Sequence, residues 1–175
     1  MPDASALLVI DMQAGLLHAP QPPHQKEQLI THTVGLIHAA RAAQSPVFFA
    51  RHTGPEGSPI AAGSPLWQLA DELPLEAGDR YFNKTRPSCF FNTSLLAELQ
   101  QAQVKRLVIV GMKTDYCVDT TCRAAADLGF DVVLVSDAHS TTDNAVLSAA
   151  QIVAHHNATL AGPFVTLLAT DDVIF

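Results

Sequence analysis

Three side chains with complementary chemistry follow apolar, strand-like segments of the sequence. Asp11 directly follows one such segment, Lys84 ends a second, and Cys117 lies just beyond a third. A carboxylate can take a proton from a thiol and return it to a leaving amine, while an ammonium group keeps the carboxylate ionised and oriented. Together, the three residues predict nucleophilic catalysis by a cysteine.

Each of these residues also has a purely structural interpretation. A cysteine is often a small core residue, an aspartate after a strand can cap a turn, and a lysine usually lies on the surface. Cys117 differs from Cys89 and Cys122, which we interpret as structural, because it lies in a strand-to-helix turn. The positive end of the helix dipole and free N–H groups favour a thiolate there and could receive an oxyanion.

Composition limits the class of protein. A chain of 175 residues, 48% of them apolar, can bury the core of one compact domain (residues 1–175). The net charge of −7 argues against a nucleic-acid partner. Three cysteines form neither a disulfide framework nor a zinc pattern, the N-terminus lacks a basic leader, and no apolar run approaches the roughly 20 residues that span a membrane. We therefore expect a cytoplasmic protein with no membrane partner.

Apolar runs alternate along the chain with segments of helical period. Continuous Val, Ile and Leu runs are typical of strands buried on both faces, so they predict a parallel sheet between helices, which is a three-layer α/β/α fold. In such folds ligands bind beyond the carboxyl ends of the strands, where the strand order reverses. The predicted strands are residues 6–10, 46–50, 80–84, 106–110, 131–135 and 164–168, and the predicted helices are 25–43, 94–101, 116–128 and 144–155.

One long connection is rich in glycine and proline. Residues 53–77 exceed the usual length of a loop and are predicted to form a lid or a partner contact, with a short helix near residues 66–70. Neither glycine-rich phosphate motif, G-x-G-x-x-G or G-x-x-x-x-G-K-[ST], occurs in the sequence. This argues against a dinucleotide or nucleotide cofactor, and we expect no cofactor.

At its reactive residues the sequence resembles the isochorismatase-like cysteine hydrolases. This superfamily includes nicotinamidases, N-carbamoylsarcosine amidohydrolase and ureidoacrylate amidohydrolase. The motif around the cysteine is the most specific part of the resemblance, and the matches run in order along almost the whole chain. They are residues 8–13 (LVIDMQ), 82–86 (FNKTR), 110–118 (VGMKTDYCV) and 135–138 (VSDA).

The resemblance implies a Rossmann-like, six-stranded parallel sheet of order 3-2-1-4-5-6. That order places its reversal between the strands that carry Asp11 and Cys117. It also implies a catalytic triad of Asp11, Lys84 and Cys117, and a non-proline cis peptide between Met112 and Lys113. That peptide would aim the N–H of Lys113, together with that of Cys117, at a developing oxyanion. Related enzymes often form dimers or tetramers, so a homo-oligomer is expected.

Two departures from the family pattern bear on the substrate. Nicotinamidases of this superfamily hold a metal through an aspartate-x-histidine pair after the second strand, but residues 50–54 read ARHTG. We therefore expect no metal and interpret His52 as a pocket residue. Lys113 stands where many relatives carry a small residue, and its side chain is expected to face solvent or a neighbouring subunit. The residues predicted to shape the pocket are Gln13, His52, Trp67, Phe82, Thr114 and Tyr116, while His139, His155 and His156 are interpreted as structural or interfacial.

The predicted function is hydrolysis of a C–N bond in a small amide, ureido compound or lactam, through a thioester on Cys117. True isochorismatases cleave a vinyl ether and lack this cysteine, so its presence argues against that reaction. A non-catalytic binding or scaffold protein of the same fold is the main alternative. A redox pair of Cys117 and Cys122 is disfavoured, because residues five apart on a helix point about 140° away from each other.

Overall fold

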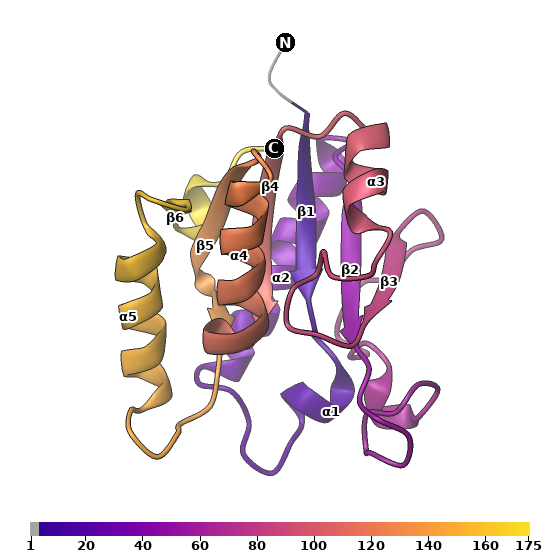
Figure 1. Cartoon of the computed structure of the whole chain (residues 1–175), viewed down its shortest axis with the longest axis vertical. Helices are drawn as coiled ribbons and strands as arrows, with labels where there is room; N and C mark the ends of the chain where they lie inside the picture. The colour runs from indigo at the N-terminus through magenta and orange to yellow at the C-terminus, as the bar shows by residue number, and fades with distance from the viewer. Residues whose placement is uncertain (1–3) are drawn as a thin grey trace.

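The computed structural model describes residues 4–175 and contains a six-stranded parallel sheet (Figure 1). Its order, β3-β2-β1-β4-β5-β6, confirms the predicted 3-2-1-4-5-6 topology. The predictions of one domain over residues 1–175 and of no N-terminal leader include residues 1–3, which lie outside the described residues. The strands are β1 (Ser5–Ile10), β2 (Val47–His52), β3 (Arg80–Lys84), β4 (Arg106–Met112), β5 (Asp131–Ser140) and β6 (Thr166–Leu168).

Helices cover both faces of the sheet (Figure 1). On one face, α3 (Leu95–Gln101), α4 (Asp119–Asp127) and α5 (Ala149–Leu160) pack against the strands, and α2 (Lys26–Ala42) packs against the other. Strand β1 is completely buried and sends alternate side chains into the two cores, with Leu8 on the first face and Leu7 on the second. This explains its unbroken apolar run, because neither face of the strand meets water.

Three elements near the carboxyl edge differ from the prediction. Strand β5 continues to Ser140 rather than ending at residue 135, because its pairing with β4 resumes after a register shift, with Gly111 opposite His139. Helix α5 begins four to five residues later than predicted, where Ser148 and Gln151 form a reciprocal capping box. The predicted helix over residues 116–128 is divided into a π-helical turn, Thr114–Val118, followed by α4.

The long connection between β2 and β3 packs against the segment that follows β1. A short helix, α1 (Ala14–Leu17), was not predicted, and the predicted helix near residues 66–70 is a single 3-10 turn, Pro65–Trp67. Gly15 permits this contact, because a Cβ there would lie 2.8 Å from the carbonyl oxygen of Leu66. Among residues 4–175, no helix has both the length and the apolar character needed to cross a membrane.

Candidate active site

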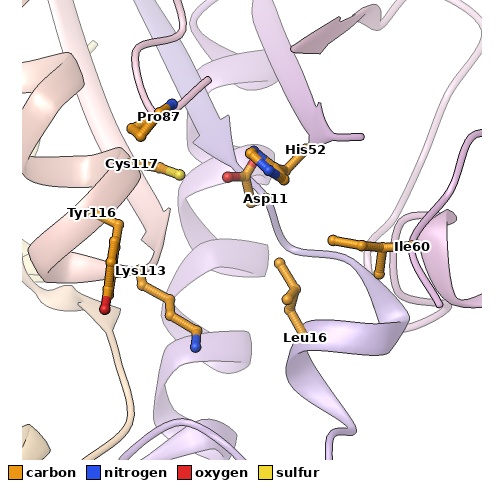
Figure 2. A pocket seen from close by; sticks show the side chains of 8 residues that line it. All are labelled: Asp11, Leu16, His52, Ile60, Pro87, Lys113, Tyr116 and Cys117. Carbon is orange, nitrogen blue, oxygen red and sulfur yellow. The ribbon is translucent and has the colours of Figure 1, made fainter. Parts of the chain in front are cut away.

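The structure brings Asp11, Lys84 and Cys117 together at the carboxyl edge of the sheet. Lys84 Nζ donates a hydrogen bond to Asp11 Oδ2 at 2.8 Å and another to Cys117 Sγ at 3.1 Å. All three residues are buried. In Figure 2 the Asp11 carboxylate and the Cys117 sulfur point toward each other. This arrangement places a thiol and a carboxylate in contact with the same ammonium group.

The ends of the strands position these side chains. Asp11 directly follows β1 in a left-handed conformation (φ 51°), and its N–H donates to the carbonyl of Ala50 on β2. Lys84 is the last residue of β3 and pairs in register with His52. Gly111 on β4 has a φ of 119°, and a Cβ at this position would collide with the backbone of Ile10. Glycine therefore lets β4 lie against the end of β1, close to Asp11.

Lys84 is the positive centre of the site. Besides Asp11 and Cys117, its Nζ lies 3.2 Å from His52 Nδ1 and 3.3 Å from the carbonyl of Arg86. Burial lowers the pKa of Lys84, but attraction to Asp11 outweighs burial, so the pKa is raised. Burial and the charge of Lys84 lower the pKa of His52. His52 is therefore neutral, and because Nδ1 accepts from the ammonium, its proton is on Nε2.

The cysteine is a thiol in the resting site. Burial raises the pKa of Cys117 to about 12, and the charge of Asp11 adds to this effect. This corrects the expectation that the start of the helix favours a thiolate, since desolvation and a neighbouring carboxylate dominate here. Burial also raises the pKa of Asp11, although Lys84 opposes the shift. One ammonium balances one negative charge, and the carboxyl is intrinsically the stronger acid, so Asp11 holds that charge.

A cavity of about 330 Å³ opens onto Asp11 and Cys117 (Figure 2). Of the six residues predicted to shape the pocket, His52 and Tyr116 line this cavity, whereas Gln13, Trp67, Phe82 and Thr114 do not. The cavity also has apolar walls that the sequence did not indicate, because their side chains carry no reactive group. The lining residues are Asp11, Leu16, His52, Ile60, Pro87, Lys113, Tyr116 and Cys117.

Gln13 and Trp67 lie behind the cavity wall and support it. The Gln13 amide accepts from the N–H of His52 at 2.8 Å and donates to the carbonyls of His52 and Trp67 at 3.0 and 2.8 Å. The Trp67 indole donates to Thr53 Oγ1 at 3.0 Å. Gln13 therefore fixes His52 and ties the end of β2 to the long connection.

Phe82 and Thr114 are also buried away from the cavity. Phe82 packs in the same apolar core as Cys117. Thr114 Oγ1 lies 2.8 Å from His139 Nδ1, whose Nε2 lies 2.7 Å from Asn157 Oδ1. Because the Asn157 amide donates to the carbonyl of Ser136, its oxygen is the acceptor, so His139 carries its proton on Nε2 and accepts from Thr114. This chain joins the turn before Cys117 to β5 and α5.

Lys113 begins the turn that carries the cysteine. The peptide bond between Met112 and Lys113 is cis, and the carbonyl of Lys113 accepts from the N–H groups of Tyr116 and Val118 at 3.1 Å each. Its side chain lines the cavity. Lys113 is half-buried, so its side chain lines the cavity and still meets solvent, and a contact with a neighbouring subunit stays a prediction.

Asp11, His52 and Cys117 are also the one set of three potential metal ligands within residues 4–175, with ligand atoms within 4.8 Å of one another. However, Lys84 Nζ lies within 3.2 Å of the Asp11, His52 and Cys117 atoms that would bind the ion. With Lys84 protonated, these residues do not fit a divalent cation, because the ammonium already occupies their electrostatic centre.

Comparison with known proteins agrees with the fold and with the sequence motifs. The family model of the isochorismatase domain matches residues 5–169. The chain belongs to the isochorismatase family. Its relatives include the secreted isochorismatase effector Isc1 of Verticillium dahliae, which is 31% identical over 97% of this chain and 90% of its own length. Nicotinamidase 3 of Arabidopsis thaliana is 29% identical over 78% of this chain and 79% of its own length.

Solved structures of the isochorismatase family share the architecture. A crystal structure of an isochorismatase family protein superposes with a TM-score of 0.89 at 35% identity, covering 95% of this chain and 98% of its own. The chain is thus an isochorismatase-like hydrolase by family, and this family includes hydrolases that act on amides.

Proposed function

We propose that this isochorismatase-like protein hydrolyses a C–N bond of a small amide, ureido compound or lactam through a thioester on Cys117. The observation that carries the proposal is the contact of Lys84 Nζ with both Asp11 and Cys117, whose side chains line a partly enclosed cavity. The triad offers the three functions that acyl transfer needs, which are a nucleophile, a proton carrier and a charge that holds the carrier ionised.

In the proposed mechanism, Asp11 takes the thiol proton as Cys117 Sγ attacks the substrate carbonyl. Because burial raises the pKa of the Cys117 thiol, the proton leaves during the attack rather than before it. The carboxyl of Asp11 then gives this proton to the departing nitrogen, and the C–N bond breaks to leave a thioester. Asp11 next takes a proton from water, whose oxygen attacks the thioester, and the returning proton restores the Cys117 thiol.

The turn before Cys117 is the proposed oxyanion site. The N–H of Lys113, across the cis peptide, and the N–H of Cys117 both belong to this turn. Such donors are most effective when they are fixed before the reaction begins. The hydrogen bond from Thr114 to buried His139 supplies this support.

A panel of primary amides, ureido acids and lactams, scored by ammonia release or ring opening, tests the proposal. We expect at least one compound to be hydrolysed, with no loss of rate in EDTA because the triad supplies the chemistry without a metal. Iodoacetamide should block the activity by alkylating Cys117, and the substrate should slow this reaction. The Cys122→Ala variant is the matched control, because Cys122 is buried in the core away from the cavity.

Two results would contradict parts of this proposal. Loss of activity in EDTA, restored by a divalent cation, would refute metal independence. Binding of amides without turnover, in a protein whose Cys117 reacts no faster than a buried thiol, would instead favour the non-catalytic binding or scaffold function.

The cytoplasmic location and a homo-oligomeric state, dimer or tetramer, are also proposals. The three free cysteines support a reducing compartment. The exposed apolar side chains of Val146 and Leu147, in the connection between β5 and α5, support a subunit contact. Sedimentation equilibrium would measure the mass of the assembly, and a monomer at micromolar concentration would contradict the oligomer.

A further inference from the structure

The side chain of Lys113 is an unpaired cation in the wall of the cavity. In Figure 2 it extends away from Cys117 and passes between Tyr116 and Leu16, with its nitrogen at the far end. Within residues 4–175 the ammonium group forms no ion pair. The nearest acidic residue along the chain, Asp115, instead accepts a hydrogen bond from Thr141 at 2.6 Å.

The other charges of the cavity are already balanced. Asp11 is paired with Lys84 at 2.8 Å, and His52 is neutral because burial and Lys84 lower its pKa. Asp11 is the one acidic side chain that lines the cavity among the described residues. Lys113 therefore gives the cavity a local positive charge, although the protein as a whole carries a net charge of −7.

Between the two ends, the walls are mainly apolar. Leu16, Ile60, Pro87 and Tyr116 line the cavity, and in Figure 2 Leu16 and Tyr116 lie on either side of the Lys113 side chain. Such walls bind a short hydrocarbon or planar body and offer it few hydrogen bonds. The polar recognition is therefore concentrated at the two ends, with the reacting amide at Cys117 and a second polar group at Lys113.

We propose that the substrate carries an anionic group, such as a carboxylate, that pairs with Lys113 while its amide or ureido carbonyl lies at Cys117. This inference rests on the proposed function, and it narrows the substrate class to small amido or ureido acids. An ion pair inside a partly enclosed, apolar cavity is stronger than one on the surface, because less water screens it. It would also fix the distance of the carbonyl from the thiol.

The test compares malonamate, succinamate and glutaramate with their uncharged methyl esters. For the wild type we expect kcat/KM to be about tenfold or more higher for the anion than for its ester at one chain length. A hydrogen bond between charged groups contributes enough free energy for a preference of about tenfold. Lys113→Met keeps the backbone N–H but removes the charge, and should lower this anion-to-ester ratio by about tenfold. Lys113→Arg should retain most of it.

Lys105→Met is the matched control, because Lys105 lies in the turn before β4 and does not line this cavity. It should leave the ratio unchanged. Equal ratios in the wild type and in Lys113→Met, or a wild-type preference for the esters, would overturn the inference.

A binding measurement separates this inference from the proposed function. Calorimetric titration with glutarate needs no turnover and should show binding that Lys113→Met weakens by about tenfold. If no amide is hydrolysed but this charge-dependent binding is found, the hydrolase proposal fails and the anion site stands. If other amides are hydrolysed and glutarate binds equally to both proteins, the anion site fails and the hydrolase stands. If glutarate does not bind and kcat/KM shows no preference for the anion over its ester, the inference is overturned.

Discussion

At the scale of single residues, the central feature of the candidate site is that Asp11 and Cys117 together hold one proton. Lys84 can balance one negative charge, and both Asp11 and Cys117 have raised pKa values. The resting state is therefore a carboxylate, an ammonium and a thiol. The reactive thiolate of Cys117 then forms only when Asp11 takes its proton.

This division predicts the acid limb of the pH profile. Asp11 must be ionised to accept the proton, and burial raises its pKa, so kcat/KM should fall as the pH decreases through a value above that of an ordinary aspartate. The measurement is kcat/KM between pH 4 and pH 9 for an amide whose own charge is constant in this range. Asp11→Asn should lose about 10²–10⁴-fold in rate. If the residual kcat/KM of Asp11→Asn falls at the same acidic pH as that of the wild type, a group other than Asp11 controls the acid limb.

At the scale of elements, the carboxyl ends of β1, β3 and β4 hold the triad, and two features fix their positions. One is the close approach of β4 to β1 at Gly111. The other is the hydrogen-bonded chain from Thr114 through His139 to Asn157, which ties the turn before Cys117 to β5 and α5. Each feature can be tested without changing a triad residue.

Gly111→Ala should destabilise the protein by about 2 kcal/mol or more, because the residue has a φ of 119° and its Cβ would collide with Ile10. Urea unfolding measures the change. Gly35→Ala is the control, since Gly35 lies in α2 with free space around it and alanine favours a helix. Equal stabilities of Gly111→Ala and the wild type would mean that the strand ends can move apart freely.

His139 predicts a pH dependence of stability. Burial lowers the pKa of His139 to about 4, and His156 acts in the same direction, whereas the hydrogen bond to Asn157 and the charge of Asp137 oppose the shift. Because its pKa is higher in the unfolded chain, the unfolded state binds more protons, and the free energy of unfolding decreases as the pH falls from about 6.5 toward 4. His139→Gln cannot bind this proton, so its stability should decrease less between pH 7 and pH 4.5. Parallel pH dependences in the two proteins would contradict the assignment.

At the scale of the whole molecule, two apolar cores on opposite faces of the sheet hold the site in place. Phe48 and Phe49 are neighbours in β2, both are completely buried, and they point into different cores. Phe48→Ala and Phe49→Ala should each cost about 3–5 kcal/mol. Ile174→Ala, at a residue that is 76% exposed, should change the free energy of unfolding by less than about 0.5 kcal/mol. A negligible loss at either phenylalanine would show that its core is not closely packed.

The sheet was predictable from the sequence because its strands are buried on both faces. Unbroken apolar runs such as residues 106–110 can be recognised as buried strands from their residue types. The reactive residues lie at or just beyond the ends of such runs. The last five residues of β5 were not predictable, because their pairing depends on Gly111 and Met112 of the neighbouring strand. The helical period over residues 144–155 does not locate the start of α5, which is set by the capping box of Ser148 and Gln151.

The triad could be proposed from the sequence because its residue types and their order along the chain are distinctive. The residues that line the cavity could not be predicted in this way. Gln13 and Thr114 looked like pocket residues from their place near the reactive side chains, yet their hydrogen bonds turn them into supports behind the wall. Lys113 is predicted to face solvent or a neighbouring subunit, and the structure adds that this half-buried side chain lines the cavity. The direction in which such a side chain points depends on tertiary contacts, which residue types alone do not determine.

The central claim is that Cys117 is the nucleophile, and Cys117→Ala tests it most directly. The measurement is kcat/KM for ammonia release from an amide that the wild type hydrolyses, with the fold of the variant checked by its unfolding curve. The account predicts a loss of about a thousandfold or more, because no other group in the cavity can form the thioester. Activity within about tenfold of the wild type in a folded Cys117→Ala variant would contradict it.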